Sequence, residues 1–247
     1  MTHQSTNLAE GVAAHTVATP RAELTTDERA DMYRLLQCHF EGVTPTQFNN
    51  DLAEKDWALR IFHGQRLVGF TTLQLYETTV DDTRVCVVYS GDTIVAREAW
   101  GSPTLARGWI RLVRSLKDES APMPWYWLLL SSGFRTYRFL PVFWREFWPR
   151  HDADTPAHTA TLLQQLARAR FGPCFDAARG VVRFAHPQRL RDHLAGIPDG
   201  RELDPHAQFF FERNPGHADG DELVCLTELS DENLTRAGCR MVRNGAP

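Results

Sequence analysis

The sequence lacks an apolar run that could span a bilayer. Its longest uninterrupted apolar stretch, Trp125–Leu130, falls far below the roughly 20 residues that a membrane-spanning helix needs. An excess of basic residues is also absent, because 27 Lys and Arg stand against 31 Asp and Glu, for a net charge of −4. That balance does not fit a nucleic-acid-binding surface. We therefore expect a globular protein with no membrane span and no nucleic-acid partner.

Paired cysteines and targeting signals are missing as well. Five cysteines are scattered over 247 residues without a Cys-x-x-Cys pair, which fits neither a disulfide framework nor a zinc site. The polar stretch 206–221 contains His, Glu and Asp but lacks the His-Glu-x-x-His spacing, so we expect a surface loop and no metal. Residues 1–20 have neither a basic start nor an apolar core, so they form no signal peptide. These features predict a cytoplasmic location.

Hydrophobic periodicity predicts the order helix, helix, strand, strand, strand, helix, strand, helix up to Trp148. Two further strands are expected at 209–211 and 223–229, after a helix over 155–170. The chain therefore divides into a flexible tail (1–24), an α/β core (25–150) and an α+β C-terminal extension (151–247) packed on the core.

The most informative unit is a strand, loop and helix around residue 101. A helix that starts directly after a strand presents unpaired backbone N–H groups and the positive end of its dipole, which suits an anion. Gly101 permits a close backbone approach, Ser102 and Thr104 can cap or donate, and several arginines lie nearby in the sequence. An ordinary strand-to-helix turn with solvated arginines is the alternative. The P-loop and dinucleotide-binding glycine motifs are both absent.

The order of elements resembles the GCN5-related N-acetyltransferase (GNAT) superfamily, and the segment Arg97–Ala106 resembles its phosphate loop. That loop usually reads Arg/Gln-x-x-Gly-x-Gly/Ala, whereas here Gly101 is kept and Ser102–Thr104 replace the rest. The resemblance implies a mixed central sheet flanked by helices and a pantetheine thioester as co-substrate, from acyl-CoA or an acyl carrier protein. It implies donor contacts at Trp100, Gly101, Ser102, Thr104 and Leu105.

A dense aromatic segment follows the loop. Ten aromatic residues fall between Trp125 and Trp148, which indicates either core packing or an apolar channel for an acyl chain longer than acetyl. The resemblance places Ser131 and Ser132 where a strand separates from its neighbour to admit pantetheine; both could equally form a simple turn. It also makes Tyr137 a candidate general acid, with a buried packing tyrosine as the alternative.

Asp92 is the best candidate for a general base. A carboxylate within an otherwise apolar strand has its ionisation perturbed by burial, as base chemistry needs. A structural aspartate at a β-bulge marked by Gly91 is the alternative, and Glu98 is a second candidate base.

The resulting hypothesis is an acyltransferase that moves an acyl group from a pantetheine thioester to a small-molecule or peptide amine. The alternative is a non-catalytic GNAT-like module that binds an acyl group or a partner. The sequence leaves open the acceptor, the acyl length, the choice between CoA and carrier protein, and the oligomeric state.

Overall fold

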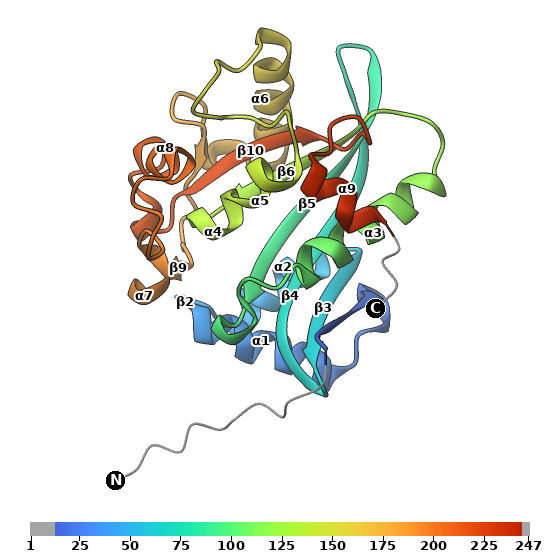
Figure 1. Cartoon of the computed structure of the whole chain (residues 1–247), viewed down its shortest axis with the longest axis vertical. Coiled ribbons are helices and arrows are strands. Elements are labelled where there is room, and N and C mark those ends of the chain that lie inside the picture. The colour runs from blue at the N-terminus through green and yellow to red at the C-terminus, as the bar shows by residue number, and fades with distance from the viewer. Residues whose placement is uncertain (1–12, 244–247) are drawn as a thin grey trace.

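A computed structural model describes residues 13–243, and its centre is a twisted eight-stranded mixed sheet (Figure 1). The strands run in the order β1-β3-β4-β5-β6-β10-β8-β7, and every neighbouring pair is antiparallel except β5 and β6. Their bounds are β1 (His15–Pro20), β3 (Trp57–His63), β4 (Arg66–Val80), β5 (Thr83–Val95), β6 (Trp125–Ser131), β10 (Glu222–Glu228), β8 (Val181–Val182) and β7 (Phe175–Asp176). A separate two-stranded sheet joins β2 (Phe40–Glu41) to β9 (Arg189–Leu190).

Helices cover both faces of the large sheet. One face carries α3, α4, α5, α8 and α9, which pack on a core that includes Val88, Leu129 and Cys225. The opposite face carries α1 and α2 over β3–β5 and α6 over β5, β6 and β10. The helix bounds are α1 (Thr26–His39), α2 (Pro45–Ala53), α3 (Thr104–Asp118), α4 (Phe134–Tyr137), α5 (Phe139–Phe143), α6 (Ala157–Phe171), α7 (Asp192–Ala195), α8 (Pro205–Arg213) and α9 (Arg236–Val242).

Local sequence signals explain where the first helices begin. Thr25 accepts a hydrogen bond from the Glu28 N–H while the Glu28 carboxylate accepts one from the Thr25 N–H, so a complete capping box starts α1. Thr44 caps α2 ahead of Pro45 in the first turn. These helices, the β3–β4 hairpin, β5, α3 and β6 lie within a few residues of the predicted positions.

Two predicted elements were wrong. Residues 13–24 are not part of a tail, because His15–Pro20 forms edge strand β1, antiparallel to β3; residues 1–12 lie outside the described part. This strand is bonded on one side only and mostly exposed, so its sequence has no alternating apolar signal. Residues 209–211 form part of helix α8 rather than a strand: Asp204 caps its start, and only Phe210 of the three phenylalanines is fully buried.

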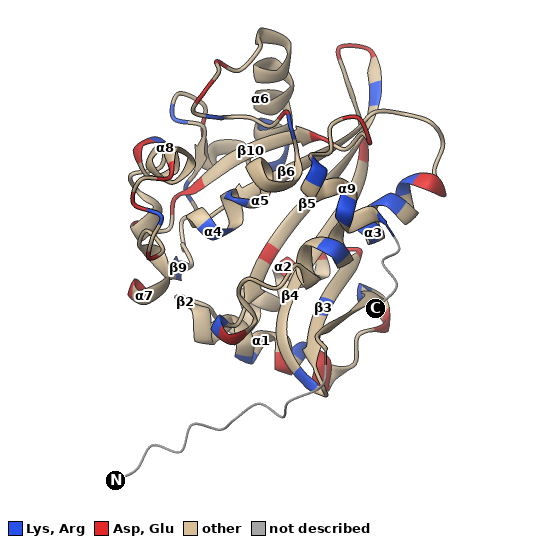
Figure 2. Cartoon of the chain, viewed as in Figure 1, with Lys and Arg blue, Asp and Glu red and all other residues tan. Residues whose placement is uncertain are grey.

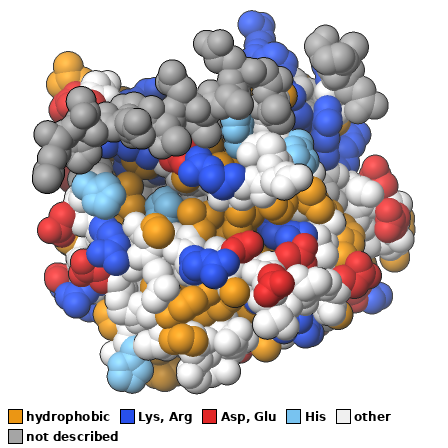
Figure 3. All heavy atoms as spheres, turned by 90° about the horizontal axis from the view of Figure 1, so that it is seen from below, with side chains coloured by type: hydrophobic (Ala, Val, Ile, Leu, Met, Phe, Trp, Pro, Cys, Tyr) orange, Lys and Arg blue, Asp and Glu red, His pale blue; other side chains and the backbone are white. Residues whose placement is uncertain are grey.

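The C-terminal third of the chain completes the large sheet. Strand β10 pairs with β6 from Leu223↔Ser131 to Glu228↔Tyr126, and its side chains contribute to the cores on both faces. The aromatic helix predicted after β6 consists of the two short helices α4 and α5. Lys, Arg, Asp and Glu are interspersed over the ribbon (Figure 2). On the face seen from below, hydrophobic side chains gather in patches between charged ones (Figure 3).

Candidate active site

Strands β5 and β6 part in the middle of the sheet. Their parallel pairing runs from Cys86↔Trp125 to Ser90↔Leu129 and ends there, although β5 continues to Val95. At the same level β5 has an irregular pairing with β4, since Thr71 pairs with Thr93 and Leu73 pairs with Ser90. Gly91 and Asp92 together therefore stand opposite Thr72, which is the arrangement of a β-bulge. The bulge directs β5 away from β6 and opens the sheet.

Two tryptophans fix the point where the strands separate. The Ser90 hydroxyl accepts hydrogen bonds from the indole N–H of Trp109 on α3 (3.2 Å) and of Trp127 on β6 (2.9 Å). The two rings lie 4.2 Å apart, and Trp144 packs against both. Ser90 is therefore held to both flanking elements, and the opening begins directly after it.

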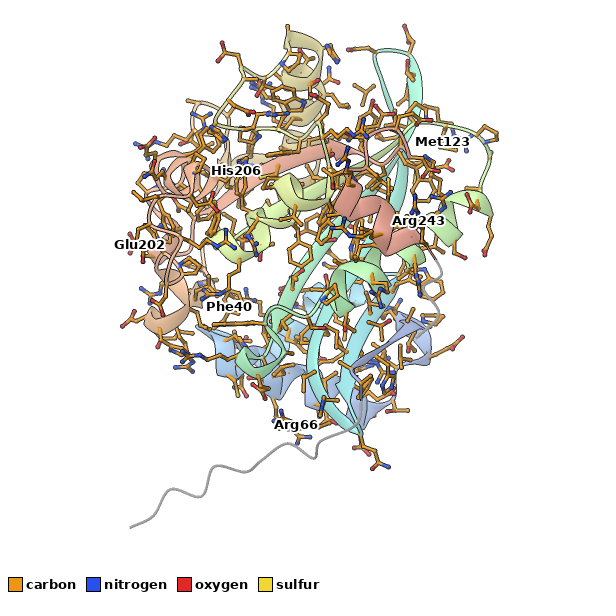
Figure 4. The ribbon with its side chains drawn as sticks, viewed as in Figure 1. Phe40, Arg66, Met123, Glu202, His206 and Arg243 are labelled. Carbon is orange, nitrogen blue, oxygen red and sulfur yellow. The ribbon has the colours of Figure 1, made fainter. Side chains whose placement is uncertain are left out.

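A cavity of about 700 Å³ passes through this opening. Leu105 and Phe134 line it on the α3 face of the sheet, while Tyr89 and Leu130 line it on the α6 face. Phe40, labelled in Figure 4, is among its lining residues and belongs to β2, where it pairs with Leu190 of β9. The volume falls within the range of small-molecule sites, and the lining residues come from both faces of the sheet.

The loop before α3 presents free backbone groups to this cavity. Gly101 adopts a φ of +83°, and a Cβ placed there would meet nothing within 4 Å, so its surroundings are open. Ser102 accepts a hydrogen bond from the Thr104 N–H (3.3 Å), but Pro103 at the cap offers no side-chain acceptor. Within the described residues, the Leu105 N–H has no backbone or side-chain acceptor, so the start of α3 suits an anion.

Most of the residues predicted at this loop line the cavity. Trp100, Gly101, Ser102 and Leu105 do so, whereas Thr104 supports the loop through its hydroxyl, 2.6 Å from that of Ser102. The Trp100 indole donates to the Val95 carbonyl oxygen (2.8 Å), which ties the loop to the end of β5.

Arginines from elsewhere in the chain complete the positive end of the cavity. The Arg135 guanidinium lies 3.9 Å from the centre of the Trp100 ring, and Arg138 and Arg201 also line the cavity. Burial, followed by repulsion from Arg97, lowers the pKa of Arg135. Figure 2 shows Lys and Arg on α4 beside this region. By contrast, Arg111 and Arg114 of α3 bond to Met241 and Asp231, so they do not serve the loop.

Carboxyl groups gather at the other end, on the face that carries α2 and α6. Asp92 lines the cavity, and burial raises its pKa to about 6 against the partly offsetting charge of Lys55. Burial also raises the pKa of Glu222 to about 7; a hydrogen bond from Ser132 works in the opposite direction. Asp51, whose pKa burial raises too, lines the same wall. Carboxyl groups with raised pKa values are suited to accept a proton near neutral pH.

Three predicted site residues take other places. Tyr137 is fully buried, its hydroxyl donates to the Pro149 carbonyl oxygen (3.0 Å), and it does not line the cavity, which favours the alternative of a buried packing tyrosine over the general acid implied by the resemblance. Ser131 is buried opposite Leu223 and is not a lining residue, whereas Ser132 is. Glu98 pairs with Arg66 outside the cavity.

Sequence reasoning missed two ionisable residues that lie near Asp92. Lys55 stands between Glu54 and Asp56, which is typical of a solvated turn, and Glu222 follows an acidic loop. Both positions become part of a site only when α2 and β10 are placed beside the β5 bulge. The one sequence signal for Glu222 was its position directly before an apolar strand.

Within residues 13–243 no helix is both long and apolar enough to cross a membrane, and no group of three or more His, Cys, Asp or Glu is arranged to hold a metal ion. No protein-family model matches the chain, and no curated protein matches its sequence.

Solved structures that the chain resembles include proteins of the superfamily predicted from the sequence. A probable N-acyltransferase from Enterococcus faecalis V583 shares 12% identity over 51% of this chain and 31% of its own, with a TM-score of 0.39. The GNAT-family N-acetyltransferase YhbS from Escherichia coli, in complex with CoA, shares 14% identity over 52% of this chain and 69% of its own, with a TM-score of 0.38. An acyl-CoA N-acyltransferase from Pseudomonas aeruginosa shares 17% identity over 47% of this chain and 79% of its own, with a TM-score of 0.35.

Proposed function

We propose that this chain is a divergent GNAT-like N-acyltransferase, which moves an acyl group from a pantetheine thioester to an amine. The observation that carries the proposal is the cavity through the sheet where β5 and β6 part after Ser90 and Leu129. It connects an anion-binding helix start on one face with proton-accepting carboxyl groups on the other. Such a passage lets a donor and an acceptor enter from opposite sides and meet at the bulge.

The donor side is argued from the loop and the arginines. The open N–H groups at Gly101 and Leu105 and the guanidinium of Arg135 suit the pyrophosphate of CoA, because a helix start and arginine both favour phosphate oxygens. The pantetheine arm would then lie along the separated edges of β5 and β6. Their backbone groups, no longer paired with each other beyond Ser90, are available to its amides.

The proposed reaction needs one base and one stabilised oxyanion. The amine of the acceptor, after losing a proton to Asp92 or Glu222, attacks the thioester carbonyl; the C–N bond forms, the C–S bond breaks, and the departing thiolate takes up a proton. Backbone N–H groups at the opening, around Gly91 and Ser132, would stabilise the oxyanion. Thioester and ammonium thereby give amide, thiol and one released proton.

The acyl group would lie against apolar side chains of α4 and α5. Phe134, Phe139, Val142 and Phe143 line the cavity beside the opening, which is more apolar surface than an acetyl group can cover. This part of the aromatic segment forms a wall of the cavity, whereas Trp127, Trp144 and Phe147 are buried in the core. We therefore expect donors with chains longer than acetyl, carried by CoA or by an acyl carrier protein.

Release of free thiol from acyl-CoA, measured in the presence and absence of amines, tests the proposal. We expect amine-dependent thiol release and an acceptor that gains the mass of the acyl group. The same assay separates the alternative, a non-catalytic module: such a protein would bind acyl-CoA without releasing thiol, and Asp92→Asn would leave that binding unchanged.

A further inference from the structure

The acceptor end of the cavity contains a buried cation, Lys55, with no carboxylate within ion-pair distance among the described residues. Lys55 is only 5% exposed and lines the cavity, yet within the described residues its ammonium has one hydrogen-bond acceptor, the Asp51 carbonyl oxygen at 3.1 Å, and no ion pair within 4 Å. A buried ammonium can donate three hydrogen bonds and is costly when they are unmet. Two of the three N–H donors of Lys55 are therefore free to bind an acceptor that enters the cavity.

The local backbone makes room for this cation. A Cβ at Gly91 would lie 2.7 Å from the Lys55 Cε and 2.9 Å from the Thr72 hydroxyl oxygen, so a side chain there would displace Lys55 from its position at the bulge. Lys55 and Arg170 both lie over the ring of Tyr89, at 5.1 and 4.8 Å from its centre. Arg170 binds Glu54 through one nitrogen, while its buried Nε has no partner among the described residues. Two cations with unmet donors thus share one wall of the cavity.

Carboxyl groups without a cationic partner stand across from them. Neither Asp92 nor Glu222 forms an ion pair within 4 Å in the described part of the chain, although both line the cavity beside the opening. Asp51 faces the same space, so three carboxyl groups share it with Lys55 and with Arg170, which is bound to Glu54. The acceptor end therefore has room for a cation beside Asp92 and Glu222 and for an anion beside Lys55.

We propose that the acceptor is an amino acid, whose carboxylate binds to Lys55 and Arg170 and whose amino group lies between Asp92 and Glu222 at the opening. The identification rests on the proposed acyl transfer and deepens it. A single molecule with both charges meets both sets of unmet groups. A simple amine would leave Lys55 unpaired, and a diamine would place its second ammonium against Lys55 and Arg170.

The test compares amino acids with amines that lack the carboxylate. Octanoyl-CoA is supplied with a mixture of the common protein amino acids, with the corresponding amides, with phenethylamine or with 1,4-diaminobutane, and products are identified by mass. We expect kcat/KM for the best amino acid to exceed that of its amide at least tenfold. Lys55→Met should remove this preference, so that kcat/KM for the amino acid and for its amide become equal within about twofold. Lys117→Met, whose ammonium bonds to the Leu229 carbonyl oxygen far from the cavity, is the matched control.

The outcomes separate this inference from the proposed function. Equal or faster acylation of amides or diamines would overturn the amino-acid assignment and leave the transferase standing. No acylation of any amine would overturn the transferase; the amino-acid site is then judged by whether amino acids, and not their amides, raise the melting temperature of the wild-type protein. If Lys55→Met does not fold, Arg170→Gln addresses the same wall and should lower the preference for the carboxylate.

Discussion

Ser90 on β5 lies opposite Leu129 on β6, and the parallel pairing of the two strands ends at these residues. The cavity, the loop before α3 and the carboxyl groups near Lys55 are all arranged around the opening that follows. The Ser90 hydroxyl, bonded to the indoles of Trp109 and Trp127, holds the strands together up to that point. The position of the opening is thus set by one small polar residue in a cluster of large aromatic ones.

Replacing Ser90 by alanine should destabilise the protein more than the loss of one small hydroxyl group usually does. Ser90→Ala leaves two buried indole N–H groups without an acceptor, at a cost of about 2–4 kcal/mol in the free energy of unfolding. Urea denaturation measures this difference. The matched control is Ser120→Ala: Ser120 is exposed and donates to the Leu116 carbonyl oxygen, so we expect a change within about 1 kcal/mol. Equal effects of the two variants would show that the bonds to Ser90 contribute little.

Activity should rise with pH through the range in which the carboxyl groups ionise. With pKa values raised to about 6 for Asp92 and about 7 for Glu222, the base becomes available between pH 5 and 8, so kcat/KM should climb there. In the pH–rate profile of Glu222→Gln, the part of the rise in kcat/KM near pH 7 should be absent. An unchanged profile in both Glu222→Gln and Asp92→Asn would exclude these groups as the base.

The same raised pKa values affect stability in the opposite direction. The folded protein binds a proton at Glu222 more tightly than the unfolded chain does, so stability falls as pH rises from about 4.5 to about 7. Glu222→Gln has no carboxyl group to ionise, so its free energy of unfolding should not show this decrease, which is on the order of 1–3 kcal/mol. Above pH 7 the variant should therefore be more stable relative to wild type than it is at pH 4. Glu228→Gln, exposed at the far end of β10, is the control and should follow wild type. A constant difference between wild type and Glu222→Gln from pH 4 to 8 would contradict the assignment.

Affinity for the donor should increase with acyl length until the apolar wall is covered. Each buried methylene contributes about 0.8 kcal/mol, or roughly fourfold in affinity. Phe143→Asp should weaken decanoyl-CoA far more than acetyl-CoA, measured by calorimetry on variants whose fold is checked by circular dichroism. Phe211, also half-buried against the same core but not lining the cavity, provides the control Phe211→Asp. A flat response from acetyl to decanoyl would mean that these aromatics only pack the core.

The sequence predicted the elements whose local signals are strong. The capping box at Thr25, the proline after Thr44 and the period of apolar residues in α3 all describe contacts within one turn, and the structure has helices there. Strand β1 was not predicted because an edge strand with no fully buried residue needs no apolar alternation. Part of α8 was predicted as a strand because three consecutive phenylalanines favour a buried β-segment.

The site was predictable only where one segment forms it. The loop Trp100–Leu105 and the bulge at Gly91 and Asp92 are local, and both lie at the cavity. Lys55, Arg170 and Glu222 come from three distant elements, and no local pattern distinguishes them from surface charges. Tyr137 was carried over from a resemblance, but its hydroxyl is taken up by Pro149, a contact that depends on how the chain turns after α5.

Binding of coenzyme A at the loop before α3 is the most direct test of the account, and a thermal shift measures it. We expect coenzyme A to raise the melting temperature of the wild-type protein, because a ligand that binds only the folded state stabilises it. Gly101→Asp, which adds a negative side chain beside the free N–H groups, should abolish the shift. The matched control is Gly64→Asp: Gly64 also has a positive φ and open surroundings, but it lies in the β3–β4 turn and does not line the cavity, so this variant should keep the shift. A shift that survives in Gly101→Asp, or none in wild type with either coenzyme A or an acyl carrier protein, would contradict the account.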